Sequence, residues 1–341
     1  MILIEPKVEL LKEDNFYSHV ANCARVCYAS NNNSNISDEQ FCKNVLIANN
    51  HLSMFRHATI YCKYNKNDWN RYTVDTFHLA QNINVIDIGD LYVIMNGQSY
   101  LEFKRNNVAE NLKIDSHIIK DLPNELKEYK RFTFKVITQI STSRELNRVS
   151  PNNIAERSTR YCNYSKDKFG NQITICKPHF YNNLSHDERE AFDNRLKEDE
   201  YAYIKRIQRG WKPEDARELL PLCTATEVAY TYSVKEWRQI LDLRYYGTTG
   251  KPHPNAKIIA TYIKDILFSL GYNCVNDSLM IELIFDTINF WSNDIFRTKK
   301  GTPIVFIKGE GYYTLSDPND IDSDPDRKLQ SKYIKIIKDF K

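Results

Sequence analysis

One segment near the middle of the chain constrains the fold more than any other. From Phe132 to Ile140, aromatic and aliphatic side chains alternate with mostly polar ones. A period of two places the two kinds on opposite faces and predicts a β-strand that packs one face against a core. The chain must therefore build a sheet, and apolar helices elsewhere in the sequence must cover it.

Helices are predicted on both sides of this strand. Two capping boxes mark helix starts, at Ser37–Gln40 and at Ser185–Glu188. The first helix is expected to run to about Asn49 and the second, a long one, to about Arg209. Three further helices are expected: one that ends near Tyr28, one over Val234–Leu243 and one over Ala256–Leu270. Four further strands are expected, over Ile2–Leu11, Phe55–Tyr64, Asp90–Met95 and Thr226–Tyr232.

This mixture of segregated strands and long helices predicts the α+β class, with a mixed sheet. The sequence from Tyr64 to about Lys130 is rich in Asn and Asp and is interpreted as an insertion. We therefore expect one main domain over residues 1–275, with an insertion over about 64–130, and a C-terminal extension over 276–341. A hairpin is expected in the extension, formed by Pro303–Lys308 and Tyr312–Leu315 around a Gly-Glu-Gly turn.

Composition excludes several classes of protein. The 341 residues carry 47 Lys+Arg and 44 Asp+Glu, a net charge of +3, which argues against a dedicated nucleic-acid binder. Only 10 residues are glycine, and neither a G-x-G-x-x-G nor a P-loop pattern occurs. A Rossmann site and a P-loop are therefore excluded, and any nucleotide must be held by arginines and helix ends.

The cysteines and the apolar segments indicate a compartment. None of the 8 cysteines has C-x-x-C spacing, so no structural metal site is expected and the thiols are expected to be reduced, as in the cytoplasm. The N-terminal residues include acids and resemble no signal peptide. The apolar run Ile258–Leu270 is interrupted by charges and is too short to cross a membrane, so we expect a cytoplasmic protein with no membrane partner.

The densest candidate for chemistry is the segment from Arg144 to Tyr161, which follows the central strand directly. It contains four arginines, two glutamates and several hydroxyl side chains. Arginine binds phosphate through two parallel hydrogen bonds, and carboxylates suit ribose hydroxyls or a base imide. The alternative is a solvated, charged surface loop held by ordinary ion pairs.

Two more arginines and two histidine segments add to this candidate. Arg217 and Arg244 each adjoin strongly apolar sequence, where an unpaired charge is costly, so each needs a ligand anion or a structural carboxylate. Histidines lie in the segment His51–His57 and at His253. Each could equally be a structural hydrogen-bonding residue, and neither has the spacing of a metal ligand.

Taken in order, these segments resemble the flavin-dependent thymidylate synthase family. The resemblance covers about residues 1–62 and 130–270 and rests on six elements. They are Ala24–Ser30, His51–His57, the signature segment Arg148–Tyr161 with its Glu-x-Ser-x-Arg-Tyr ending, Ala216–Pro221, Glu236–Arg244 and Pro252–Asn255.

The resemblance implies an α+β homotetramer whose active sites lie between subunits. It implies reduction of FAD by NADPH, followed by reductive methylation of dUMP to dTMP with methylenetetrahydrofolate and without a cysteine nucleophile. Transferred by matched position, the expected dUMP-binding residues are Glu145, Arg148, Glu156, Arg157, Ser158, Thr159, Arg160, Arg217 and Arg244. The expected FAD-binding residues are Cys27, Ser53, Arg148, Glu156, Ser233, Lys235, Gln239 and His253.

Among these residues, Arg244 matches the catalytic position. There it would polarise the uracil imide and stabilise the charge that develops as the C5 carbon attacks. Ser158, Thr159 and Arg160 would hold the phosphate with help from Arg217.

The sequence also departs from the family pattern. Val149 and Ser150 replace the His-Arg of the Arg-His-Arg signature, and Arg56 stands where the family has Glu. The phosphate side is thus largely intact and the flavin side is altered. Two alternatives follow: a relative that hydroxymethylates its nucleotide or acts on dCMP, or a nucleotide-binding homologue without catalysis.

Overall fold

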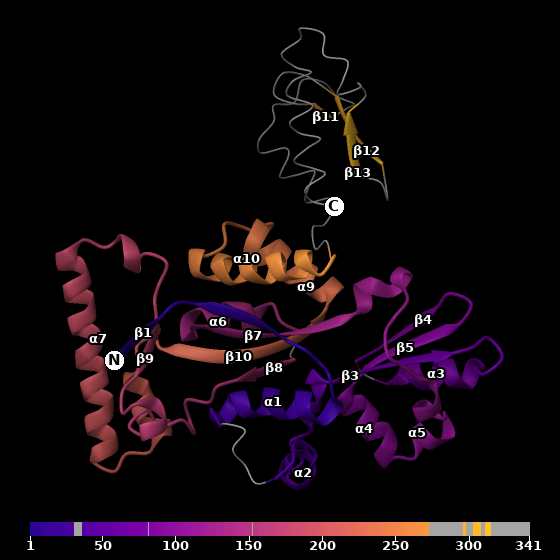
Figure 1. Ribbon diagram of the computed structural model, residues 1–341, viewed down its shortest axis with the longest axis horizontal. Coiled ribbons are helices and arrows are strands. Elements are labelled where there is room, and N and C mark those ends of the chain that lie inside the picture. The colour runs from indigo at the N-terminus through magenta and orange to yellow at the C-terminus, as the bar shows by residue number, and fades with distance from the viewer. Residues whose placement is uncertain are drawn as a thin grey trace.

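The computed structural model describes residues 1–272, except 31–35, 81 and 152, and the backbone of three short strands further on. Its centre is a four-stranded antiparallel sheet in the order β2-β7-β10-β8 (Figure 1). The strands are β2 (Lys7–Leu11), β7 (Arg131–Gln139), β10 (Ala225–Ser233) and β8 (Ile154–Glu156). The strand predicted over 132–140 is confirmed as β7, and the α+β class is confirmed with it.

Alternation along β10 sends two sets of side chains to opposite faces of this sheet. Val228, Tyr230 and Tyr232 belong to the main core, which is covered by α6 (Ile140–Arg148), α9 (Val234–Leu241) and α10 (Pro254–Ser269). Ala229 lies on the other face in a smaller cluster with α1 (Phe16–Tyr28). Figure 1 shows α9 and α10 on one side of the sheet and α1 on the other. We call these the α10 face and the α1 face.

A second sheet lies beside the first in the order β4-β5-β3-β6. Its strands are β3 (Thr59–Tyr64), β4 (Ile83–Asp87), β5 (Leu91–Asn96) and β6 (Ile118–Ile119), and its helices are α3 (Arg71–Leu79), α4 (Gly97–Arg105) and α5 (Val108–Asn111). Phe77, Val93 and Ile114 are fully buried in a core that belongs to this lobe. The lobe coincides broadly with the expected insertion, although β3 precedes it, and the domain boundaries stay predictions.

A third group of elements lies at the opposite end of the central sheet (Figure 1). Strand β1 (Ile2–Ile4) pairs in parallel with β9 (Thr174–Cys176), next to the long helix α7 (His186–Gln208). The single strand expected over 2–11 is therefore wrong, because the chain changes partner between β1 and β2. Pro6 lies at that break, and it lacks the N–H that a continuous ladder requires.

Both predicted capping boxes are confirmed, and Ser233 with Glu236 forms a third at the start of α9. Two helices change type instead of continuing. Helix α2 (Asp38–Phe41) passes into a π-helix over Cys42–Ile47, and α9 passes into one over Asp242–Tyr246.

The strand expected from Phe55 starts only at Thr59, because Leu52–His57 is a 3-10 helix. The end of this 3-10 helix is held by Arg131, whose guanidinium donates to the main-chain oxygens of Arg56 and Ala58 at 2.8 and 3.1 Å. The Ala58 oxygen also accepts from the Gly97 N–H at 3.0 Å, whereas the Arg56 oxygen is satisfied by the Arg131 side chain.

The remaining elements are short. Helix α8 (Pro213–Ala216) starts with a proline, and 3-10 turns lie at Ile114–His117, Asn124–Tyr129, Asp167–Phe169, Tyr181–Asn183 and Arg217–Leu219. In the extension, β12 (Pro303–Ile307) pairs antiparallel with β13 (Gly311–Thr314), which confirms the hairpin, and with β11 (Phe296–Arg297). The rest of 276–341 lies outside the described residues. Among the helices that the structure describes, none combines the length and apolar character needed to cross a membrane.

Candidate functional site

A cavity of about 720 Å³ opens where β8 ends, and we call it the β8 cavity. Four segments form it: the start of α6, the end of β8 with the residues that follow it, the loop after α8 and the start of β10. Its polar lining consists of Ser143, Arg144, Glu156, Arg157, Ser158, Thr159, Arg217, Glu218 and Thr226. Five of the nine expected dUMP-binding residues thus line one cavity, with a volume typical of a small-molecule site.

Strand pairing explains how Glu156 enters this cavity. Glu156 lies opposite Val228 in the β8–β10 ladder, so its side chain is on the α10 face, toward α6. There its carboxylate accepts hydrogen bonds from Ser143 Oγ at 2.7 Å, Asn147 Nδ2 at 3.0 Å and Thr226 Oγ1 at 3.0 Å. Three neutral donors from two elements therefore fix the carboxylate without an arginine or lysine partner.

A further hydrogen bond, from Tyr230, orients Asn147 toward the Glu156 carboxylate. Tyr230 is buried in the core and donates its hydroxyl to Asn147 Oδ1 at 2.7 Å. Because the Asn147 oxygen is occupied in this way, its amide nitrogen is directed to Glu156. Burial raises the pKa of Tyr230 well above its ordinary value, so the hydroxyl remains a hydrogen-bond donor.

Arg157, the next residue, points the other way. Its Nη2 donates to Glu227 Oε2 at 2.6 Å on the α1 face. Arg157 thus lines the β8 cavity from its edge while its guanidinium is paired outside it. Its role in dUMP binding stays a prediction.

The turn after β8 is tied to two other segments. The Ser158 N–H donates to the Cys27 carbonyl of α1 at 2.9 Å. Arg160 Nε donates to Glu214 of α8 at 2.8 Å, and this ion pair keeps the pKa of the Glu214 carboxyl below its ordinary value. Arg160 itself is 61% exposed and does not line the cavity.

Arg244 has a different partner. Its Nε and Nη2 donate to the main-chain oxygen of Glu145 at 3.2 and 3.0 Å. This carbonyl belongs to the last turn of α6, where a cation is favourable. Arg148 is the exposed last residue of the same helix. None of the three residues lines the β8 cavity, although all were expected near dUMP.

The expected FAD-binding residues are divided between the two faces of the central sheet. Cys27 is on the α1 face, where burial raises the pKa of its thiol to about 11, and Ser53 is exposed on the 3-10 helix before β3. Ser233 caps α9, which also carries Lys235 and Gln239, and His253 caps α10. Of this set, only Glu156 lines the β8 cavity, and the FAD assignments stay predictions.

The residues that depart from the family pattern make internal contacts. Val149 packs against the main core, and Ser150 shares a hydrogen bond with the Tyr232 hydroxyl. Arg56 donates from Nε to Gln98 of α4 at 2.6 Å. These three side chains are therefore engaged in holding the fold and are not directed at a common ligand site.

The histidine segment before β3 contains a buried residue. His57 is fully buried, and its Nδ1 lies 2.8 Å from Thr231 Oγ1. A chain of hydrogen bonds continues from Thr231 to Thr133 at 2.7 Å and from Thr133 to His19 Nε2 at 2.8 Å. Burial lowers the pKa of His57 to about 3, and it also lowers the pKa of His19. His57 is thus a neutral structural residue, the alternative left open by its sequence.

Sequence reasoning did not assign roles to Ser143, Asn147 and Thr226, which contact Glu156. Thr226 carries no local signal, since a β-branched residue is ordinary in a strand. Arg144 belongs to the arginine-rich segment, but its place on the cavity wall follows only from the helical conformation of α6. Among the described residues, no group of three or more His, Cys, Asp or Glu is arranged to hold a metal ion.

The fold and the site together define an α+β protein with an arginine-lined cavity at one end of its central sheet. Residues 90–267, a little more than half of the chain, match the Thy1 family, described as thymidylate synthase complementing protein. The chain belongs to this family, which is the flavin-dependent thymidylate synthase family that the sequence resembles. The matched residues include the whole lining of the β8 cavity but not Cys27 or Ser53.

Two solved structures are among those similar to the chain. They are crystal structures of the UMP/dUMP methylase PolB from Streptomyces cacaoi, bound with 5-Br dUMP and with 5-Br UMP. Both are 16% identical in sequence to this chain, and both matches cover 79% of it. The match covers 93% of the 5-Br dUMP structure, with a TM-score of 0.37, and 92% of the 5-Br UMP structure, with a TM-score of 0.38. No curated protein sequence matches the chain.

Proposed function

We propose that this protein is a flavin-dependent thymidylate synthase, which methylates dUMP reductively to dTMP with methylenetetrahydrofolate, FAD and NADPH. Family membership supports a flavin-dependent enzyme that modifies a pyrimidine nucleotide. The observation that carries the proposal is the β8 cavity. It collects Glu156, Ser158, Thr159 and Arg217 in one lining, although Arg217 is 58 or more residues away in sequence from the others.

The phosphate of dUMP would lie against Ser158, Thr159 and Arg217. Two hydroxyls and a guanidinium offer donors of the kind that phosphate accepts, and the lining carries three arginines against two glutamates. Opposite the phosphate, the fixed Glu156 carboxylate would accept from the ribose or the uracil. Because the cavity already holds this carboxylate in place, little side-chain entropy is lost when the nucleotide binds.

Arg244 would act on the uracil ring. A guanidinium beside the uracil carbonyls stabilises the negative charge that develops when C5 attacks. In the structure this guanidinium is bonded to the end of α6, next to Arg148, and it would exchange the Glu145 carbonyl for the nucleotide. Reduced flavin, when bound, supplies the electrons that turn the transferred carbon into a methyl group.

The flavin would bind between copies of the chain. The expected FAD residues lie on both faces of the sheet, so a second copy must supply one part of the set to the other. This supports the homotetramer with shared active sites that the resemblance implies. A variant that no longer forms the oligomer should therefore also no longer bind FAD.

One alternative has an observation in its favour. Val149 and Ser150 replace the two side chains that the family directs at flavin, and both are engaged in the fold. This favours a relative that uses the nucleotide cavity for a different modification, such as hydroxymethylation or a reaction on dCMP.

Two measurements test the proposal. Purified protein should bind FAD and turn yellow, and its gene should rescue a thymidine-requiring bacterial strain. A colourless protein that takes up no added FAD would refute both enzyme readings.

The cavity assignment has its own test. Arg217→Ala should weaken dUMP binding by about ten-fold, the scale of one charge-assisted contact, when measured by calorimetry. Arg209→Ala, at the exposed end of α7, is the matched control and should bind dUMP like the unchanged protein. Equal dUMP affinity in Arg217→Ala would remove the phosphate assignment.

A further inference from the structure

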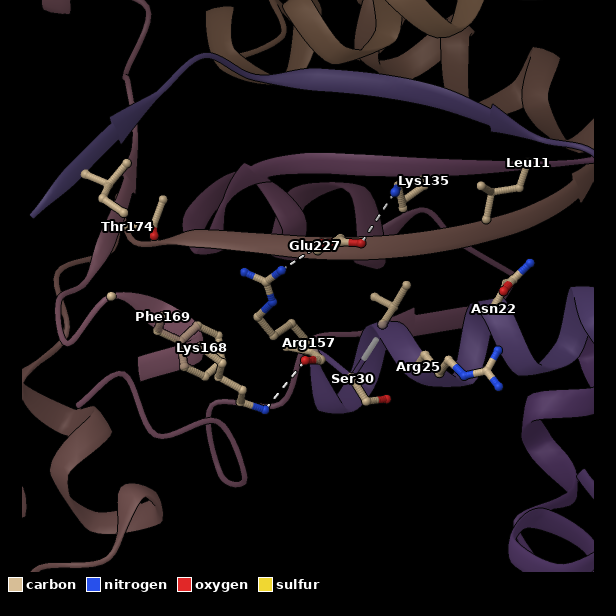
Figure 2. Close-up of a pocket in the computed structure, with 14 residues that line it drawn as sticks. Leu11, Asn22, Arg25, Ser30, Lys135, Arg157, Lys168, Phe169, Thr174 and Glu227 are labelled. Carbon is tan, nitrogen blue, oxygen red and sulfur yellow. Dashed lines mark hydrogen bonds and ion pairs between the residues drawn. The ribbon is translucent and has the colours of Figure 1, made fainter. Parts of the chain in front are cut away.

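A second cavity, of about 780 Å³, lies on the α1 face of the sheet, and we call it the α1 cavity (Figure 2). Its roof is the polar part of the sheet, with Lys135 of β7 and Glu227 of β10. Its floor is the C-terminal half of α1, and one end is closed by the loop that carries Lys168 and Phe169. None of the residues expected to bind FAD lines it, and Arg157 is the only residue expected to bind dUMP that does.

Positive charge dominates this cavity. Four cationic side chains from four separate segments line it, and the lining itself contains one carboxylate, that of Glu227; just outside the lining, Asp38 pairs with Arg25 at 2.6 Å and Glu9 pairs with Lys135 at 2.9 Å. The four are Arg25, Lys135, Arg157 and Lys168. The β8 cavity, by comparison, has three arginines and two glutamates in its lining. Because Arg25, Lys135 and Arg157 each have a carboxylate partner, the excess positive charge of this cavity comes from Lys168.

Two of these cations share the single carboxylate of the wall. Glu227 lies 2.6 Å from Arg157 Nη2 and 3.8 Å from Lys135 Nζ, and Lys135 also reaches Glu9 at 2.9 Å. Figure 2 shows one terminal nitrogen of Arg157 on Glu227 and the other pointing away from it. Arg157 Nε is buried and has no hydrogen-bond partner among the described residues. A guanidinium with donors left over, beside one shared carboxylate, favours a further anion.

Lys168 adds a charge that no described carboxylate neutralises. Its Nζ donates to the carbonyls of Tyr28 and Ala29 at 3.2 and 3.5 Å, at the C-terminal end of α1. Main-chain carbonyls hold the ammonium in place without cancelling its charge. A neighbouring apolar surface is provided by Phe169, Val26 and Leu11, so the cavity offers both an anion site and a wall for a ligand body.

We propose that the α1 cavity binds a small organic polyanion, one that carries phosphate or carboxylate groups, at a site separate from the nucleotide cavity. Lys168 and Arg157 are its anchors. Its size exceeds what one phosphate fills, so the ligand has an apolar or neutral body as well. The two cavities share Arg157, so a ligand in one lies next to the wall of the other. This inference does not depend on the reaction proposed above.

Calorimetry on the full-length protein tests it with two probes, inorganic pyrophosphate for the phosphate class and citrate for the carboxylate class. Each is titrated at constant ionic strength, with and without saturating dUMP. We expect saturable binding of at least one probe in both conditions. The probe that binds more tightly identifies the chemical class.

Variants locate the probe. Lys168→Gln, which keeps a donor for the α1 carbonyls, should weaken probe binding at least five-fold and leave dUMP affinity unchanged, while Lys168→Arg should retain binding. Lys166→Gln, two residues away and exposed, is the control and should change nothing. Three results would overturn the proposal: no saturable binding of either probe, displacement of the probe by dUMP, or equal weakening in the Lys166 and Lys168 variants.

Discussion

The buried hydrogen-bonded chain from His57 to His19 predicts that this protein loses stability in mild acid. His57 has no exposed surface, and the positive charges of Arg131 and Arg56 act on it. Burial, and then these charges, lower its pKa from 6.5 to about 3. A proton on the ring would be left without water and beside other cations, so the folded protein does not accept it.

The sign of the effect follows from where the proton goes. Below pH 6.5 the unfolded chain takes up a proton at His57, whereas the folded protein takes it up only near pH 3. The free energy of unfolding therefore falls as the pH falls through this window, by about 1.4 kcal/mol per pH unit. From pH 7 to pH 5, His57 alone should cost about 2 kcal/mol of stability. The pKa of His19 is lowered as well, so it adds to the loss.

Urea unfolding at pH 7, 6 and 5 measures this dependence. His57→Gln, which can still bond to Thr231, should lose about 2 kcal/mol less than the unchanged protein over the same range. His186→Gln is the matched control, because the His186 side chain is 89% exposed. The same pH dependence in the His57 variant and the unchanged protein would refute the reasoning.

Three further predictions concern the β8 cavity and its surroundings. Tyr230→Phe removes the hydroxyl that orients Asn147 and should lower the free energy of unfolding by about 1 kcal/mol in urea titrations; no change would show that the bond contributes nothing. Arg244→Ala should abolish product while flavin stays bound, as followed by flavin absorbance and product analysis, and unchanged turnover would remove its proposed role. Glu214→Gln should free Arg160 and tighten dUMP binding about three-fold in calorimetry; weaker binding would contradict a role for Arg160 at the phosphate.

The central sheet and the main helices follow from local patterns. The alternation around Phe134 and the capping boxes at Ser37 and Ser185 depend only on residues within a few positions, and both are confirmed. The errors arise where distant residues decide. Arg131 ends the 3-10 helix before β3 by binding its carbonyls, and a change of partner strand divides the first ten residues at Pro6.

The same distinction applies to the site. Ser158 and Thr159 are neighbours in one motif, so the sequence alone predicts that they face one ligand. Thr226 reaches Glu156 only because β10 pairs with β8, which no local pattern indicates. The expected flavin residues lie on different faces of the central sheet, and no local pattern brings them together.

The most direct test of the proposed reaction is the mass of its nucleotide product. Purified protein is incubated with dUMP, methylenetetrahydrofolate, FAD and NADPH, and the nucleotide is analysed by mass spectrometry. The proposed function predicts dTMP, heavier than dUMP by one CH₂ unit, and its loss in Arg244→Ala. A hydroxymethylated nucleotide, or unchanged dUMP in the presence of bound flavin, would contradict it.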